Sequence, residues 1–179
     1  MIVLPRASYS KRQFFTSYVL NGEKVLFLTF SFLNVKPCPG KYDYPEHTSD
    51  VYVQAYGRSL NEAFENAALG LTGVITDVSL VRPEQTVEES VEAEDVQMLL
   101  YKWLEAILIR LDAEQMVFSE FDVKIERRGD KYVLKAVMRG EKFKQGYHTS
   151  GTHVKAVTLH DMEIEESTDR ARVKVLLDI

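Results

Sequence analysis

The segment from residue 95 to residue 111 constrains the fold most, because its apolar residues cover too much of a helix surface to face water. Asp95 is typical of a helix N-cap, and the apolar residues that follow recur at helical spacing. These residues are Val96, Leu99, Leu100, Trp103, Leu104, Ile107, Leu108 and Leu111. The width of this stripe predicts a helix that packs against a β-sheet.

A second amphipathic helix is predicted to begin after Ser59. Ser59 and Glu62 have the spacing of a capping box, in which the two side chains bond to exposed amides at the start of a helix. Apolar residues then follow at helical spacing as far as Leu71. Thr72 and Gly73 are predicted to lie near the end of this helix.

Alternating apolar and polar residues predict strands before, between and after the two helices. The predicted strands are 51–56, 86–93, 121–126, 132–138, 154–158, 162–165 and 171–177, with hairpin turns at 127–130 and 167–169. Strands that follow two amphipathic helices indicate the α+β class. We therefore expect a two-layer sandwich, with a mostly antiparallel sheet and two amphipathic helices on one face.

The first 40 residues differ from the rest in pattern and charge. Residues 36–40 (KPCPG) disfavour regular structure, and the residues before them show no sustained period. Residues 1–40 carry five basic side chains and one acid, so their net charge is +4 and the remainder of the chain carries −9. We predict an N-terminal extension over residues 1–40, either poorly ordered or a targeting segment, and one folded domain over residues 41–179.

Charge and motif content exclude several classes of function. A body of charge −9 is a poor general binder of nucleic acid and suits protein partners or cations better. The single cysteine, Cys38, excludes an internal disulfide, and the longest apolar run, 25–32, is too short to span a bilayer. Phosphate-binding glycine loops and nucleophile elbows are absent from the sequence. We expect a cytoplasmic protein, also nuclear if eukaryotic, that does not bind membranes.

Three histidines, His148, His153 and His160, lie within thirteen residues of one another. Their spacing matches no zinc motif, because they fall around a predicted loop and strand. We therefore expect solvated histidines here, with zinc ligation as the less favoured alternative.

Acidic groups lie just before the first predicted strand of the domain and at the last two residues. Asp50, immediately before a predicted strand, either coordinates a cation or caps a turn. Composition alone favours the turn. The Asp178 side chain and the Ile179 carboxylate lie close together after an apolar run. Fixed near Asp50, these carboxylates would repel one another, and a hard divalent cation would relieve the repulsion. The alternative is that the terminal acids are exposed, and spacing alone does not bring Asp50 to Asp178.

Five short blocks, in the right order, resemble the archease family. They are 41–51 (KYDYPEHTSDV), 57–65 (GRSLNEAFE), 140–141 (GE), 151–158 (GTHVKAVT) and 177–179 (LDI). The resemblance covers about residues 41–179 and leaves residues 1–40 outside. Ser49 and Pro45 depart from the family pattern, and neither change removes a proposed ligand.

The resemblance implies a function that composition does not. Archeases are metal-binding accessory proteins of the RtcB-type RNA ligase of tRNA splicing, and they promote guanylylation and repeated turnover of that ligase. By resemblance, Asp50, Asp178 and Ile179 would hold a divalent cation, which we expect to be calcium, with magnesium or manganese as alternatives. The ligase would be the partner, no residue of this chain would be catalytic, and strong direct binding of nucleic acid is not expected.

His47, Lys155 and Asp161 are predicted to support this site or to face the partner. Lys155 matches a family lysine that is expected to act at the active site of the ligase. A competing interpretation is a small metal-dependent hydrolase of phosphate esters, for which His47 is the best candidate for a general base. A third interpretation, suggested by the small α+β fold, is a chaperone-like binding module.

Overall fold

The computed structural model describes residues 14–20, 23–29, 38, 40–47 and 49–179, and the chain divides into two units, Met1–Asn34 and Val35–Ile179. In the first unit, β1 (Phe14–Leu20) and β2 (Glu23–Thr29) pair as antiparallel strands. This hairpin corrects the expectation that residues 1–40 contain no regular element. The signal in the sequence is the Asn-Gly dipeptide at residues 21–22, which is typical of a two-residue hairpin turn. Residues 1–13 and 30–37 of the predicted extension lie outside the described residues, so its disorder or targeting role stays a prediction.

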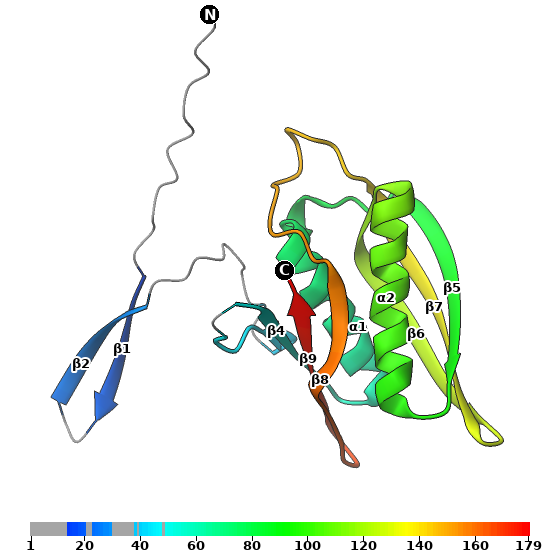
Figure 1. The fold of residues 1–179 in the computed structure, drawn as a ribbon, viewed down its shortest axis with the longest axis horizontal. Coiled ribbons are helices and arrows are strands. Elements are labelled where there is room, and N and C mark those ends of the chain that lie inside the picture. Colours follow the sequence, from blue (N-terminus) through cyan, green and yellow to red (C-terminus); the bar gives the residue numbers. More distant parts are fainter. Residues whose placement is uncertain (1–13, 21–22, 30–37, 39, 48) are drawn as a thin grey trace, which may run out of the picture. The chain divides into compact units, whose positions relative to one another are not determined.

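The second unit has three layers, with two helices between two antiparallel sheets (Figure 1). The helices are α1 (Leu60–Ile75) and α2 (Val96–Glu114), and a 3-10 turn, η1 (Val78–Leu80), follows α1. The first sheet has the order β3 (Tyr42–Asp43), β4 (Val51–Gly57), β9 (Ala171–Asp178), β8 (Ala156–Glu166). The second has the order β5 (Gln85–Ala93), β7 (Lys131–Lys142), β6 (Met116–Arg128). The predicted α+β sandwich with two amphipathic helices is confirmed.

The strands form two sheets rather than the single sheet expected, and the two helices explain why. Phe64 on α1 and Trp103 on α2 are fully buried, and the Trp103 indole N–H donates to the Phe64 carbonyl oxygen at 3.2 Å. α1 contacts β4 and β6, whereas α2 contacts β8 and β5. Helices that are apolar around most of their circumference must be covered on two sides, so the sheets enclose the pair. Within the described part of the chain, neither helix combines the length and apolar character of a membrane span.

Both helices begin where the sequence predicts. The Ser59 hydroxyl accepts from the Glu62 amide at 3.3 Å, and the Asp95 carboxylate accepts from the Met98 amide at 2.7 Å. The Glu62 carboxylate in turn accepts from the Arg58 amide at 2.8 Å, which lowers the pKa of Glu62. Thr72 and Gly73 lie near the end of α1, at Ile75, as predicted, and α2 continues three residues past Leu111 to Glu114.

Residues 154–158 and 162–165, predicted as separate strands, contribute to one strand, β8, which begins at Ala156. β8 pairs with β9 over residues 156–158 and 163–166, and the register shifts between Thr158 and Glu163. Asp161 has φ +50° in this irregular stretch, and residues 159–161 are exposed. A bulge of this kind re-aims side chains without ending the strand, which is why the alternation appeared broken.

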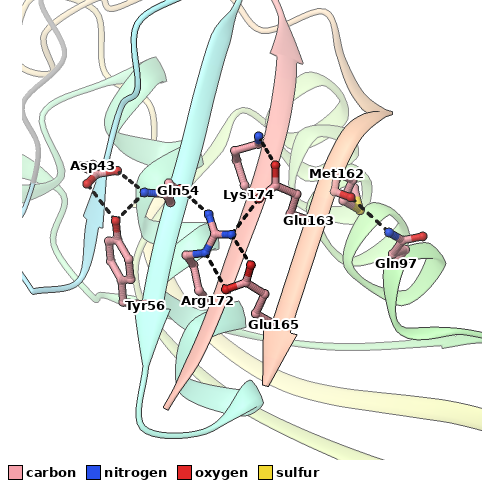
Figure 2. A network of polar contacts seen from close by, with 9 residues as sticks. All are labelled: Asp43, Gln54, Tyr56, Gln97, Met162, Glu163, Glu165, Arg172 and Lys174. Carbon is pink, nitrogen blue, oxygen red and sulfur yellow. Dashed lines mark hydrogen bonds and ion pairs between the residues drawn. The ribbon is translucent and has the colours of Figure 1, made fainter. Parts of the chain in front are cut away.

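A ladder of polar side chains crosses the outer face of the first sheet (Figure 2). Arg172 on β9 donates to Gln54 Oε1 on β4 at 2.7 Å and to Glu165 Oε1 on β8 at 2.6 Å. Glu163 on β8 accepts from both Arg172 and Lys174. Opposite charges directly across an antiparallel pair favour that register, so the ladder helps to keep β4, β9 and β8 aligned.

Gly140 on β7 has no room for a side chain, because β6 passes very close to it. An added Cβ would lie 1.9 Å from the Val117 carbonyl oxygen and 2.7 Å from the Phe118 Cα. We expect Gly140→Ala to lower the free energy of unfolding by about 1–3 kcal/mol, the usual cost of overpacking, as measured by urea denaturation. Thr86→Ala, at an exposed position on β5, is the control and should change it by less than about 0.5 kcal/mol. Equal stability of the two variants would contradict this account of the β6–β7 contact.

Candidate metal centre

The pairing of β4 with β9 brings Asp50 and Asp178 together. Val51 lies opposite Leu177, so the register continued by one residue places Asp50 opposite Asp178. Val51 and Leu177 are buried, and side chains alternate along a strand, so the two aspartates belong to the outer face of the sheet. Their side chains are 28% and 49% exposed, respectively. Two acids that sequence spacing could not connect are therefore neighbours across one strand pair.

Lys155, immediately before β8, supplies a positive charge at this point. Its amide donates to the Asp178 carbonyl oxygen at 2.8 Å. Its Nζ donates to the main-chain oxygen of Ile179 at 2.7 Å and lies 3.7 Å from Asp178 Oδ1. The ammonium group therefore lies against two of the three predicted metal ligands and offsets part of their mutual repulsion.

His47 and Asp161 are connected to the same region through Tyr52 on β4. The His47 Nδ1 accepts from the Asp50 amide at 3.3 Å, and its ring packs edge-on against Tyr52 with a centroid separation of 5.1 Å. The Tyr52 hydroxyl donates to Asp161 Oδ2 at 3.1 Å. Burial and this carboxylate raise the pKa of Tyr52, which keeps the phenol protonated as a donor. Nothing in the sequence singles out Tyr52, because this residue follows the ordinary alternation of a strand.

The donor atoms at this end of the sheet fit a hard cation. Asp50, Asp178 and Ile179 offer only oxygen, which calcium, magnesium and manganese prefer. The position of the Lys155 ammonium indicates that these oxygens favour positive charge. Among the described residues, no three His, Cys, Asp or Glu side chains lie close enough together to hold a metal ion. A metal here would therefore depend on the main-chain oxygen of Ile179 as well as on the two carboxylates.

Comparison with known proteins identifies the family. Residues 42–179 match the model of the Archease protein family. The chain is 41% identical to the protein archease of Sulfurisphaera tokodaii over 139 residues, which are 78% of this chain and 99% of that protein. The chain belongs to the archease family. It is also 45% identical to the protein archease of Aeropyrum pernix over 141 residues, 78% of this chain and 98% of that protein.

A solved structure shows the archease fold directly. The solution structure of Methanobacterium thermoautotrophicum protein 1598 is similar to this chain with a TM-score of 0.70 and 38% sequence identity. The similarity covers 78% of this chain and 99% of that one. The resemblance noted over residues 41–179 is thereby confirmed as family membership.

One of the three clustered histidines was predicted wrongly. His148 is buried, with its Nε2 3.2 Å from Glu141 Oε1, whereas His153 and His160 are exposed as expected. His148 Nδ1 accepts from the Lys144 amide at 2.8 Å, so Nε2 carries the proton and donates to Glu141. The buried Glu141 carboxylate is what allows a histidine to be buried here. The sequence singled out Glu141 only as part of the 140–141 block and gave it no role.

This buried pair lies in the segment that leads to Lys155. Glu141 also accepts from the Arg82 amide at 3.0 Å and from Lys144 Nζ at 2.5 Å. Further along, the Gly151 amide donates to the Ile75 carbonyl oxygen at 2.8 Å at the end of α1. The loop that presents Lys155 is therefore tied to the domain at both its beginning and its middle.

The buried pair predicts a specific pH dependence of stability. Hydrogen bonds from Lys144 and then from the Arg82 amide lower the pKa of Glu141 from 4.5 to about 2. Because the folded pKa lies below the unfolded value, this stabilisation is present above about pH 4.5 and is lost as the pH falls toward about 2. Glu141→Gln should be less stable than the wild type at neutral pH and should lose less stability over that acidic range. Thermal unfolding across a pH series measures both, and parallel profiles for the two proteins would refute the assignment.

Proposed function

We propose that this member of the archease family is an accessory protein that activates an RtcB-type RNA ligase in tRNA splicing, by promoting guanylylation and repeated turnover of the ligase. The observation that carries the proposal is the β4–β9 register, which gathers Asp50, Asp178 and Ile179 at one end of the first sheet. These residues would hold a divalent cation, calcium in our proposal. The cation would supply a Lewis acid for phosphate oxygens.

Lys155 has two roles in this proposal. Without another cation, its ammonium group bonds Ile179 and offsets the charge of Asp178. With a divalent cation held by the same oxygens, Lys155 would lose these contacts, because like charges are unfavourable at short range. Its ammonium group is then available to a phosphate group in the active site of the partner. His47 keeps Asp50 in place by accepting its amide hydrogen.

The charge of the domain supports a protein partner. Residues 41–179 carry a net charge of −9, which disfavours the phosphate backbone of RNA. An acidic body instead suits docking on a basic face of a ligase. High-affinity binding of tRNA by this protein alone at physiological salt would remove this support.

A metal-dependent hydrolase of phosphate esters is the second candidate, and the position of His47 beside Asp50 is the observation that favours it. Nδ1 of His47 is engaged by the Asp50 amide, which leaves Nε2 as the ring nitrogen for base chemistry. Metal-dependent turnover of a simple phosphate ester by the protein alone, abolished by His47→Ala, would favour the hydrolase. Stimulation that occurs only when the ligase is present favours the activator.

The two aspartates provide the direct test of the activator. Asp50→Asn and Asp178→Asn should each reduce calcium binding, measured by calorimetry, by at least about tenfold, because each removes one charged ligand. Both should abolish stimulation of the cognate ligase in a multiple-turnover ligation assay. Asp130→Asn, in the exposed turn between β6 and β7, is the matched control and should behave as the wild type. Full stimulation by either of the first two variants would refute the proposed site.

The role of Ile179 can be tested by extending the chain. Residues appended after Ile179 convert a carboxylate into an amide, so calcium affinity should fall while the fold is retained. A tag of the same length at the N-terminus should leave calcium affinity unchanged. Unchanged affinity after C-terminal extension would remove Ile179 from the ligand set and leave the two aspartates to be judged separately.

A further inference from the structure

A hollow lies at the carboxyl ends of both helices, next to the loop that leads to Lys155. Its volume is about 390 Å³. It is lined by Ile75, Leu111, Asp112, Gln115, Phe143, Ser150, Gly151, Thr152 and His153. Ile75 is the last residue of α1, and Leu111 and Asp112 lie in the last turn of α2. We call this feature the helix-end hollow.

The helix-end hollow combines an apolar wall with a charge that local structure does not favour. Ile75, Leu111 and Phe143 are half-buried and form the apolar part. Asp112 is exposed and makes no ion pair or hydrogen bond with any described residue. Asp112 also lies in the last turn of α2, where the helix dipole is negative, so its carboxylate destabilises this helix. Neither described helix has a basic residue in its last turn to compensate.

An exposed isoleucine extends this surface along α2. Ile109 is 58% exposed and lies three residues before Asp112, so the two are neighbours on the helix surface. Among the described residues, the other exposed large apolar side chains are Tyr147 and Leu159, which are less exposed, at 41% and 47%. Together with the half-buried Ile75, Leu111 and Phe143, Ile109 gives this end of the domain an apolar surface that suits contact with a protein partner.

We propose that the helix-end hollow binds an arginine side chain of a protein partner. The aliphatic stem of an arginine would pack against Ile75, Leu111 and Phe143. Its guanidinium group would pair with the Asp112 carboxylate and would complement the negative ends of α1 and α2. Ile109 would contact an apolar residue of the partner beside that arginine. That the partner is the RNA ligase rests on the proposed function, whereas the chemistry of the hollow does not.

The lining of the hollow disfavours other occupants. A divalent cation would find one carboxylate, Asp112, among mostly apolar and neutral groups, which is too few charged ligands. A nucleotide or another anion would meet Asp112 and the negative ends of two helices. Arginine has both the apolar stem and the planar charge that this lining complements.

The first experiment uses charge reversal in the full chain. Asp112→Lys should weaken binding to the purified ligase by about tenfold or more, measured by biolayer interferometry. The same variant should raise the melting temperature, because a positive charge at the end of α2 complements the helix dipole. A loss of binding can then not be attributed to unfolding. Asp130→Lys, with the same charge change in the turn between β6 and β7, should bind as the wild type.

The outcomes separate the two proposals. Undiminished ligase binding by Asp112→Lys would refute the arginine site while leaving the proposed function intact. Ligase binding that is lost in Asp112→Lys but kept in Asp178→Asn would assign docking to the hollow and stimulation to the carboxylate end. If the wild type does not bind the ligase, the proposed function fails, and a second experiment decides on the hollow.

The second experiment needs no partner. N-acetyl-arginine amide is titrated into the protein, and amide chemical shifts of Leu111, Asp112 and His153 are followed by NMR. N-acetyl-citrulline amide, which has nearly the same shape without the charge, is the matched probe. Arginine should shift these signals in the wild type, and neither citrulline nor the combination of arginine with Asp112→Asn should do so. Equal shifts with both probes, or no shift with arginine, would overturn the proposal.

Discussion

The antiparallel pairing of β4 with β9 is the interaction on which the rest of the domain depends. One side of this pair buries Val51 and Leu177 against the helices, and its other side carries Asp50 and Asp178. A slip of one residue would turn the apolar set to water and separate the two acids. Burial of apolar surface therefore holds two carboxylates side by side although they repel each other. The polar ladder around Arg172 acts on the same register from the outside (Figure 2).

Local features of the fold could be predicted from the sequence, whereas long-range ones could not. The N-caps Ser59 and Asp95 act within one helical turn, and both are confirmed. The division into two sheets depends on which strands meet across the helices, and a stripe of apolar residues does not encode that choice. The continuity of β8 through its bulge is also a long-range feature, because it depends on pairing with β9 on both sides of the irregular stretch. Only the hairpin of β1 and β2 was predictable and overlooked.

The candidate site also has features that the sequence predicts and features that only the structure shows. Residue types and family blocks pointed to Asp50, Asp178 and Lys155, but only the strand register places them together. His148 is a residue for which the sequence misleads. Its place in a polar loop predicts a solvated side chain, but the structure buries it. Its burial depends on a carboxylate seven residues earlier and on an amide four residues earlier. Such networks are stable only when every member is satisfied, and that condition is a property of three-dimensional geometry.

The charge distribution suggests why one end of this domain would need a positively charged partner. α1 and α2 both end toward the loop that leads to Lys155 and the carboxyl end of β9 (Figure 1). The negative charge of the helix ends, of the Asp112 carboxylate and of the Asp50–Asp178 pair is therefore concentrated at one end of the domain. In the described residues, Lys155 offsets part of this charge, while Asp112 has no counterpart. Asp112 thus departs from the local preference of a helix end, as functional residues often do. A cation between Asp50 and Asp178 would neutralise one part of this negative charge, and an arginine at the helix ends would neutralise the other. Docking and metal binding would therefore reinforce each other.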